Sequence, residues 1–232
     1  MSSYSLASWA EFCDLHSSTP LPEDVHFEHL FIDTREIVNG SGGGFFCLKG
    51  RRNGHEFIQD AINKGVLAIV IQEDYSFDLA LPNEVFILRC PNVLHALQQS
   101  ALMHRKRLVN TRFIGITGSN GKTIVKEWAH QLIESEKRAY RSFRSHNSQI
   151  GVALSVWQVK QEDQVAILEA GISSTGEMER LEAMIQPEVV VLSHIGDAHD
   201  IGFSSRQAKI EEKLRLAKNY AHTICLPEHL SD

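Results

Sequence analysis

Several features that would place a protein in a special class are absent from this sequence of 232 residues. No apolar run approaches the roughly 20 residues that a membrane-spanning helix needs. The first eleven residues lack the basic and apolar regions of a signal peptide. No two of the four cysteines form a CxxC pair, which argues against a zinc site or a disulfide framework and favours buried thiols in a reducing compartment. We therefore expect a soluble cytoplasmic protein with no membrane partner.

The sequence also lacks an excess of positive charge, because 23 Lys and Arg stand against 29 Asp and Glu, giving a net charge of −6. Such a balance provides no general field for the phosphate backbone of a nucleic acid. The basic and aromatic run 137–144 is interpreted as a local rim near bound phosphates or as plain surface. A hydrophobic fraction of 43% with 22% charged residues is ordinary for a globular protein. The expected partners are therefore small molecules, not nucleic acids.

The sequence of the first half of the chain, residues 1–108, predicts a small α/β domain. Apolar spacing and composition predict three helices and four strands: helices over Ser8–His16, His55–Lys64 and Val93–Lys106, and strands over Val25–Ile32, Phe45–Leu48, Val66–Ile71 and Val85–Leu88. The glycine-rich stretch 39–44 lacks a following Lys-Ser/Thr pair and precedes a strand, so it is interpreted as a structural turn.

The second half, residues 109–232, alternates regularly between strands and helices. Nearly all-apolar strands in repeated βα units indicate a doubly wound parallel sheet that is covered on both faces. The predicted order is strand Phe113–Thr117, helix Lys122–Glu134, strand Val165–Leu168, helix Glu177–Ile185, strand Val189–Ser193, helix Arg206–Lys218 and strand Thr223–Leu226. A sheet of this kind would continue beyond the last strand, so we expect a truncated domain.

The most informative stretch is Phe113–Thr123, in which an apolar strand leads into a glycine-rich loop and then a helix. Glycines let backbone N–H groups approach phosphate oxygens, and a helix start presents further N–H groups to an anion. Lys122 would supply a charge to the β- and γ-phosphates, and Thr123 a hydroxyl ligand for Mg²⁺. The strict pattern G-x-x-x-x-G-K-[ST] fails because Ile116 occupies its first position. An ordinary glycine turn with a solvated lysine is therefore the alternative to this P-loop.

The loop GITGSNGKT, residues 115–123, resembles the ATP loop of the Mur ligases, the ATP-dependent enzymes that form amide bonds in peptidoglycan synthesis. Six further stretches resemble this family in the same order: 33–35, 48–50, 53–57, 146–151, 168–177 and 193–199. The run VKE after the loop, the run GEMxxL and the pair AH point to the branch that joins D-Ala-D-Ala to UDP-N-acetylmuramoyl-tripeptide. One mild departure is Thr34, which replaces the usual serine and keeps the hydroxyl.

The resemblance implies an N-terminal UDP-substrate domain, a central P-loop ATPase domain and a defined reaction. ATP would phosphorylate the substrate carboxylate, and an amine would attack the resulting acyl phosphate, with catalysis resting on positioning and on charge stabilisation by Lys122 and Mg²⁺. Family members continue through the rest of the central domain and a C-terminal ligase domain. We therefore expect a fragment that is not competent alone, and a longer or fused parent chain, for example with an alanine racemase, stays open.

Nucleotide and metal ligands are expected at the carboxyl ends of the central strands. The nucleotide set is Gly118, Ser119, Asn120, Gly121, Lys122, Thr123 and, through the resemblance alone, Asn147. The resemblance implies four metal ligands: Thr123, Glu169, His199 and Lys213. Thr123 and Glu169 offer the hard oxygen atoms that Mg²⁺ prefers, whereas His199 rests on the family pattern only. The alternatives are a solvated strand end for Glu169 and an ordinary histidine at position 199.

Lys213 is expected to be the carbamylated lysine that the family carries in the helix after that histidine. With Lys122 and His199 it completes the expected catalytic set. Lys209, one turn earlier and about 40° away around the helix, is the main rival, and Lys218 should face elsewhere. A solvated lysine in the charged run 209–213 is the alternative.

Four residues of the first domain are candidates for holding the UDP-sugar: Thr34, Arg35, Lys49 and His55. Arg35 and Lys49 suit a diphosphate, and Thr34 could bond to uracil or a phosphate. Surface positions without a ligand are the alternative for each of them.

Two other functions stay open at this point. The first is a non-catalytic module that binds the UDP substrate without turnover, which a truncated chain would favour. The second is a different P-loop enzyme, such as a folylpolyglutamate-synthetase-like ligase or a small kinase. The stretches 33–35 and 53–57 argue against the second alternative.

Overall fold

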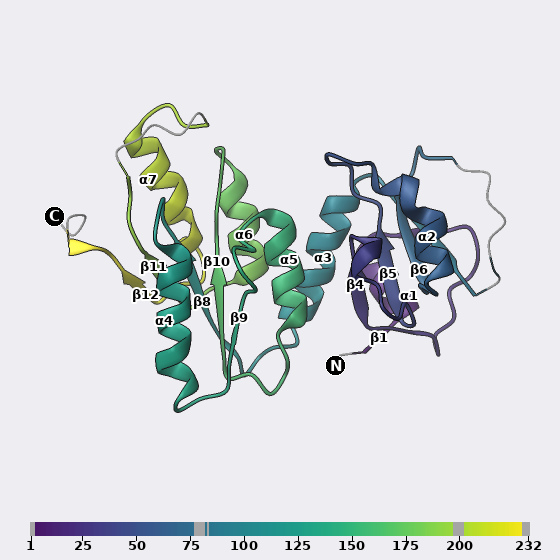
Figure 1. Cartoon of the computed structure of the whole chain (residues 1–232), viewed down its shortest axis with the longest axis horizontal. Helices are drawn as coiled ribbons and strands as arrows, with labels where there is room; N and C mark the ends of the chain where they lie inside the picture. Colours follow the sequence, from purple (N-terminus) through teal and green to yellow (C-terminus); the bar gives the residue numbers. More distant parts are fainter. Residues whose placement is uncertain (1–2, 77–81, 83, 197–201, 229–232) are drawn as a thin grey trace. The chain divides into compact units, whose positions relative to one another are not determined.

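The computed structural model of the chain describes residues 3–76, 82, 84–196 and 202–228. The chain divides into two compact units, Met1–Met103 and His104–Asp232, and each unit contains one five-stranded sheet (Figure 1). In the described ranges, no helix combines the length and the apolar character needed to cross a membrane. The predicted α/β class is confirmed.

The sheet of the first unit has the strand order β2-β7-β6-β5-β4. Strands β4 (His29–Phe31), β5 (Gly43–Phe46), β6 (Ala68–Gln72) and β7 (Phe86–Cys90) run parallel, and β2 (His16–Ser17) pairs antiparallel with β7. The helical segments of this part are α1 (Leu6–Phe12), η1 (Thr34–Glu36), η2 (Gly54–Phe57), α2 (Ile58–Asn63) and α3 (Val93–Arg105). Residues 68–71 of β6 are fully buried, as expected for a central parallel strand with both faces covered.

The predicted strand Val25–Ile32 is in fact divided between two sheets. Strand β3 (His26–Phe27) pairs antiparallel with β1 (Tyr4–Ser5), whereas β4 pairs with β5. The carbonyl of Gly42 accepts hydrogen bonds from the N–H groups of Glu28 and His29, so the chain changes its pairing partner there. An alternating sequence cannot reveal this change, because the same period of two fits either sheet.

The first helix and the glycine-rich turn show where local signals decide the structure. Helix α1 begins at Leu6, because the Ser5 hydroxyl accepts a hydrogen bond from the Ser8 N–H, and not at Ser8 as predicted. It ends at Phe12 because Asp14 adopts a positive φ of 53° and the chain turns into β2. The stretch 39–44 is the predicted turn into β5, with Gly42 at a φ of 67°.

The sheet of the second unit is entirely parallel and has the order β12-β11-β8-β10-β9. Its strands are β8 (Arg112–Thr117), β9 (Ala139–Arg141), β10 (Val165–Glu169), β11 (Val189–Leu192) and β12 (Thr223–Cys225). Its helices are α4 (Lys122–Glu134), α5 (Gln149–Gln158), α6 (Glu177–Ile185) and α7 (Arg206–Leu214), followed by η3 (Arg215–Ala217). The order reverses at β8, so this is the predicted doubly wound sheet.

Helix α4 covers one face of this sheet, and α5 and α6 cover the other (Figure 1). The apolar residues Val125, Ala129 and Ile133 of α4 pack against β8 and β10. Because parallel strands are joined by right-handed crossovers, the chain must change faces when it reverses direction after β9. The carboxyl ends of β8 and β10 therefore meet at the point where the strand order reverses, which is where doubly wound sheets bind ligands.

The predicted helices α4 and α6 have the predicted bounds, whereas one strand and one helix of this unit were missed. Strand β9 and helix α5 lie in a region for which the sequence analysis predicted no element. The predicted helix Arg206–Lys218 changes to 3-10 geometry at Arg215. Three cysteines are buried as expected, but Cys225 is exposed because it belongs to the edge strand β12.

Candidate nucleotide site

The loop between β8 and α4 depends on two glycines with positive φ. Gly118 has a φ of 145° and Gly121 a φ of 80°, conformations that L side chains rarely adopt. A Cβ atom on Gly118 would lie 2.2 Å from Ser193 Oγ and 3.0 Å from the His194 carbonyl oxygen. The loop can therefore approach β11 this closely only with glycine at position 118.

The first turn of α4 leaves backbone N–H groups available to a ligand. Among the described residues, no side chain caps this helix, whose N-cap is Gly121, and the first helical hydrogen bond runs from Val125 N–H to the Gly121 carbonyl. By contrast, the hydroxyl groups of Ser148 and Ser205 cap α5 and α7. Open N–H groups together with the helix dipole favour an anion such as a phosphate.

The loop is braced from within and from β11. Lys122 Nζ donates to the carbonyl of Gly118 at 3.0 Å and lies 3.4 Å from that of Ser119. The Ser119 N–H donates to the His194 carbonyl at 2.6 Å, and Ser193 Oγ donates to the Asn120 carbonyl at 2.7 Å. These contacts hold the backbone of the loop in a defined shape.

Two hydroxyl oxygens at this loop are buried without a partner. Thr117 Oγ1 and Ser119 Oγ make no hydrogen bond to any residue that the structure describes. A buried polar atom without a partner costs roughly 1–3 kcal/mol. A polar ligand in the loop would offset that cost, which is the behaviour expected of a binding site and not of an ordinary turn.

Thr123 and Glu169 meet at the edge of the sheet. Thr123 Oγ1 donates to Glu169 Oε2 at 3.2 Å and lies 3.4 Å from Ser145 Oγ. The Glu169 side chain is completely buried at the end of β10, so it is not a solvated strand end. The Glu169 carboxylate and the Thr123 hydroxyl offer the hard oxygen atoms that Mg²⁺ prefers, and the pair fits such an ion. Over the described residues, no three His, Cys, Asp or Glu side chains form a metal cluster.

A buried lysine completes this edge; it belongs to the run VKE, but the sequence analysis assigned it no role in the site. Lys126, one helical turn after Lys122, has no exposed surface, and its Nζ lies 3.1 Å from Glu169 Oε1. The ammonium also donates to the carbonyls of Ser142 and Arg144. A lysine between the apolar residues of α4 is the signal that could have revealed it.

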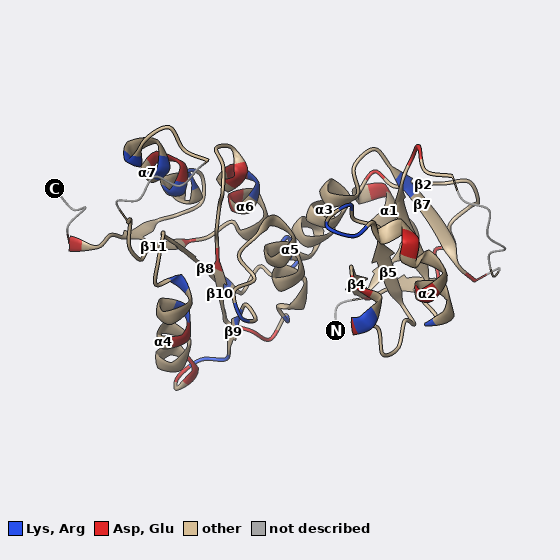
Figure 2. Ribbon diagram, turned by 45° about the horizontal axis from the view of Figure 1, so that its top comes forward, with Lys and Arg blue, Asp and Glu red and all other residues tan. Residues whose placement is uncertain are grey.

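Helix α7 is charged along its length but is partly buried. Figure 2 shows basic and acidic residues side by side on α7, as on a solvated helix. Yet Lys209, Glu212 and Lys213 are each at least 97% buried, which excludes the surface alternative. Lys213 Nζ donates to the Gly118 carbonyl at 3.1 Å, so this residue reaches the phosphate loop. Lys218, by contrast, forms an exposed ion pair with Glu179 at 3.4 Å.

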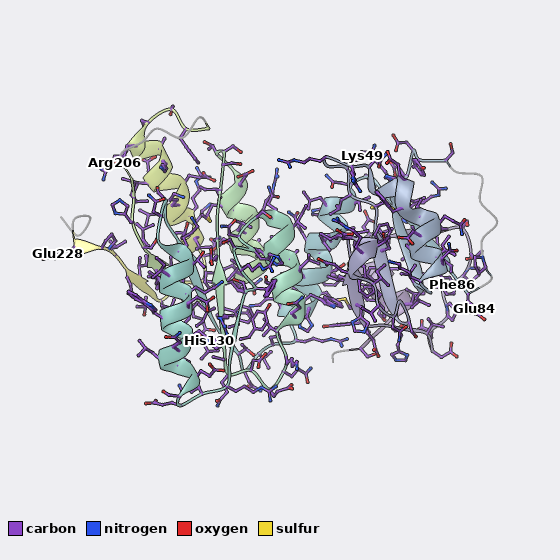
Figure 3. The ribbon with its side chains drawn as sticks, in the orientation of Figure 1. Lys49, Glu84, Phe86, His130, Arg206 and Glu228 are labelled. Carbon is purple, nitrogen blue, oxygen red and sulfur yellow. The ribbon has the colours of Figure 1, made fainter. Side chains whose placement is uncertain are left out.

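Two of the four cations in the basic run 137–144 pair with acidic neighbours. Arg138 pairs with Glu162 at 3.2 Å and with Asp163 at 3.1 Å. Arg141 pairs with Glu127 at 2.7 Å, and its guanidinium also contacts His130, which faces β9 (Figure 3). These two arginines are therefore engaged in ion pairs within the protein.

The candidate substrate residues of the first unit gather at one edge of its sheet. Thr34 and Arg35 follow β4, Lys49 lies in the loop after β5 (Figure 3), and His55 belongs to η2 in the same connection. Because β4 and β5 are parallel, their carboxyl ends meet at the same edge. The Arg35 side chain is 81% exposed and forms a bidentate ion pair with Asp33, which lowers the pKa of that carboxyl to about 2.

His55 is engaged entirely within the protein. Its side chain is buried, and burial together with the charge of Lys49 lowers its pKa. Nδ1 lies 2.8 Å from Asn53 Oδ1, while the Gln72 N–H points to Nε2 at 3.5 Å, which fits the neutral tautomer with the proton on Nδ1. The ring of Tyr75 lies 4.0 Å away, centroid to centroid. Neither ring nitrogen is left for a ligand, so His55 can only shape the site.

Comparison with known proteins gives this arrangement a family. Residues 116–226 match the model of the Mur ligase middle domain. The UDP-N-acetylmuramoyl-tripeptide–D-alanyl-D-alanine ligase of Bacillus subtilis (strain 168) is 34% identical over 203 residues, which cover 86% of this chain and 42% of that ligase. The chain is a relative of the Mur ligases, with their middle domain over residues 116–226.

Solved structures of Mur ligases share the fold. A crystal structure of MurF from Acinetobacter baumannii aligns with a TM-score of 0.86 at 22% identity, over 98% of this chain and 49% of that one. The MurF ligase from Thermotoga maritima, in complex with ADP, gives a TM-score of 0.70 at 23% identity, over 87% and 51%. The chain spans less than half the length of the curated Mur relatives that it matches.

Two Mur-type candidates remain to be located. Asn147 is half-buried, and its carbonyl accepts a hydrogen bond from the Gly171 N–H at 2.8 Å. A Cβ atom on Gly171 would lie 2.8 Å from the side chain of Asn147, so this residue packs on the loop that follows Glu169. His199 lies outside the described residues.

Sequence reasoning missed three residues that build this Mur-type site: Lys126, Ser145 and Ser193. The stretch 193–199 was recognised as a motif, but nothing in it signalled that the Ser193 hydroxyl braces the phosphate loop. Ser145 directly follows the basic run 137–144, and its position beside Thr123 depends on strand β9, which was not predicted.

Proposed function

We propose that the chain provides the UDP-substrate and ATP sites of a ligase that joins D-Ala-D-Ala to UDP-N-acetylmuramoyl-tripeptide. The observation that carries this proposal is the phosphate loop together with the uncapped start of α4. There the Thr123 hydroxyl donates a hydrogen bond to the buried Glu169 carboxylate. The printed name of the relative from Bacillus subtilis supplies the substrates. The proposal assigns residues 1–108 to the UDP-substrate domain and residues 109–232 to the ATPase domain.

In this proposal the phosphate loop binds ATP. The backbone of Gly118, Ser119, Asn120 and Gly121 surrounds the phosphates, with Lys122 and Thr123 at the β- and γ-phosphates and Asn147 nearby. The ADP bound to the Thermotoga maritima relative supports this choice of nucleotide. Lys122 would exchange its contact with the Gly118 carbonyl for the phosphate charge.

Mg²⁺ is part of the proposal. Thr123 and Glu169 would hold the ion, together with His199 and a carbamylated Lys213, which the family pattern implies. When bound, Mg²⁺ supplies positive charge that stabilises the phosphate oxygens during transfer. The burial of Lys213 and its contact with the loop support a role at this site.

The proposed reaction passes through an acyl phosphate. A carboxylate oxygen of the tripeptide substrate attacks the γ-phosphorus, and the bond to the β-phosphate oxygen breaks to release ADP. The amine of D-Ala-D-Ala then attacks the acyl carbon and loses a proton, and inorganic phosphate leaves. Lys122 stabilises the charge on the transferred group, and the loop positions it, which are the main contributions a protein makes to such transfers.

The UDP-sugar would bind at the carboxyl edge of the first sheet. Arg35 and Lys49 are exposed cations that suit its diphosphate, and Thr34 directly precedes Arg35 in η1. His55, with both nitrogens engaged, would fix the shape of this edge through Asn53 and Tyr75. The proposal includes the cytoplasm as location, where nucleotide substrates of this kind are made.

Calorimetric titration tests both halves of the proposal. UDP-N-acetylmuramoyl-tripeptide is expected to bind the chain more tightly than UDP alone, and absence of binding at millimolar ligand would contradict the role of the first unit. ADP with Mg²⁺ is expected to bind the second unit. Lys122→Ala should lower the affinity for ADP by roughly tenfold or more, since hydrogen bonds to charged groups contribute about 1.5–3 kcal/mol. The exposed Lys137→Ala is the matched control and should leave ADP binding unchanged.

A further inference from the structure

Lys126 is a cation placed where a helix normally carries an apolar residue. It lies on α4 between Val125 and Ala129, both of which pack on the core of the second unit, and its side chain has no exposed surface. Burial of an ammonium group is costly unless its charge and its protons are satisfied. A lysine in such a position therefore needs a specific set of partners.

The partners of Lys126 are all oxygen atoms from three different segments. Its Nζ lies 3.1 Å from Glu169 Oε1 on β10, 2.8 Å from the Ser142 carbonyl after β9 and 3.2 Å from Glu127 Oε1 on α4. It also donates to the Arg144 carbonyl. The ammonium thus ties the phosphate helix, the end of β10 and the turn after β9 to one point.

The two oxygens of Glu169 have separate tasks. Oε1 forms an ion pair with Lys126 Nζ at 3.1 Å but accepts no hydrogen bond from the described residues, and Oε2 accepts a hydrogen bond from the Thr123 hydroxyl at 3.2 Å. The lysine therefore fixes the orientation of the carboxylate and leaves the second oxygen beside Thr123. We propose that Lys126 is a positioning residue, which aims Glu169 Oε2 at the divalent cation of the bound nucleotide; this inference rests on the proposed function.

The turn after β9 is held by the same ammonium. Arg144 has a φ of 48°, an unusual conformation for a residue with a side chain, and its carbonyl points to Lys126. The next residue, Ser145, then lies with its Oγ 3.4 Å from Thr123 Oγ1. Lys126 thereby contacts both segments that place an oxygen atom beside Thr123, namely Glu169 Oε2 and Ser145 Oγ.

The charge of Lys126 also sets a condition for metal binding. With the ammonium on Glu169 Oε1, the carboxylate is already neutralised, so a free divalent cation meets little net negative charge. The phosphates of a nucleotide add the missing charge. We therefore expect Mg²⁺ to bind together with the nucleotide and only weakly without it.

The test measures how much Mg²⁺ increases the affinity for ADP. ADP is titrated calorimetrically into the 232-residue chain with Mg²⁺ and again with excess EDTA, and the ratio of the two affinities is compared between variants. Lys126→Gln is expected to reduce this ratio by roughly 10- to 100-fold, the usual effect of removing a group that orients a metal ligand. Its affinity in EDTA should stay unchanged, because the phosphate loop remains.

Three comparisons make the result specific. Lys126→Arg keeps the cation and should recover part of the Mg²⁺ effect, whereas the exposed Lys137→Gln should keep all of it. A folded Lys126→Gln protein with the wild-type ratio would overturn the role of Lys126 while leaving the nucleotide site intact. Absence of ADP binding by the wild-type chain would instead overturn the proposed function, and the inference with it.

The wild-type chain provides a second test should Lys126→Gln fail to fold. The ¹⁵Nζ signal of Lys126 is followed by NMR during addition of ADP, with Mg²⁺ and with EDTA. We expect the ammonium signal to persist in both cases and to shift further with Mg²⁺, because the ion binds to the other oxygen of the same carboxylate. Identical spectra in the two titrations, or loss of the signal with Mg²⁺, would overturn the inference.

Discussion

Thr123 Oγ1 lies 3.2 Å from Glu169 Oε2, although 46 residues separate the two in sequence. Thr123 belongs to the first turn of α4, which follows β8, and Glu169 ends β10, where it pairs in register with Ile116 of β8. Parallel pairing of two neighbouring strands therefore brings a hydroxyl and a carboxylate to the same edge. The stability of the sheet and the geometry of the site depend on the same register.

Changing Glu169 should therefore affect both stability and binding. Glu169→Gln removes the charge that faces Lys126, and breaking one partner of a buried ion pair costs about 3–5 kcal/mol. We expect a lower free energy of unfolding in urea and loss of the Mg²⁺-dependent increase in ADP affinity. The control is Glu162→Gln, because Glu162 is 54% exposed and its pair with Arg138 should contribute only about 0–1 kcal/mol. Equal unfolding energies for the two variants would contradict the buried pair.

A pair of glycine variants separates backbone strain from steric conflict. Gly118 and Gly176 both have positive φ, 145° and 86°, but a Cβ atom would meet Ser193 at 2.2 Å only in the first case. Gly176→Ala should cost about 1–2 kcal/mol from strain alone. Gly118→Ala should cost more and should also weaken ADP binding. Urea unfolding curves and ADP titrations check this, and similar behaviour of both variants would rule out the close approach to Ser193.

Two buried lysines on α7 can be distinguished by their different effects. Lys213 donates to the Gly118 carbonyl at 3.1 Å, so Lys213→Gln should lower ADP affinity. Lys209→Gln should lower the thermal stability, because Lys209 is equally buried. Its effect on ADP affinity should be smaller. Calorimetric ADP titration and thermal unfolding of both variants provide the measurement. A larger loss of affinity in Lys209→Gln would transfer the proposed role to Lys209.

The first unit should become less stable as the pH falls below about 6.5, the ordinary pKa of histidine. The pKa of His55 is lower in the folded protein, chiefly because the ring is buried. Below the unfolded pKa the unfolded chain binds more protons, so this contribution to stability is present above that pH and is lost toward the folded pKa. His55→Gln should flatten the dependence in urea unfolding, whereas the exposed His95→Gln should not. The wild-type slope in His55→Gln would disprove this origin.

The elements that the sequence predicted well are those with a clear amphipathic period. Helices α4 and α6 bury one side, so their apolar spacing gave the observed bounds. Helix α5 is apolar on most of its circumference and gives no such period. Strand β9 has three residues within a basic run, as short edge strands often do, and its composition concealed it.

The candidate site was predictable as far as it is local. The phosphate loop is contiguous in sequence, and glycine, lysine and threonine reveal it directly. The role of Lys126 is not local, because it depends on carbonyl oxygens of Ser142 and Arg144, which carry no sequence signal. The contacts that Asn53 and the Gln72 N–H make with the two ring nitrogens of His55 could not be predicted for the same reason.

The brace between the phosphate loop and β11 has a thermodynamic consequence. Because Ser119 is already bonded to the His194 carbonyl and Asn120 to the Ser193 hydroxyl, the loop is preorganised before any nucleotide arrives. Ordering a loop during association consumes binding free energy, and a loop ordered during folding avoids that loss. Association with ADP should therefore proceed with little entropy lost from the backbone. A substitution at the end of β11 should therefore make the entropy of ADP binding less favourable, although this segment does not contact the nucleotide.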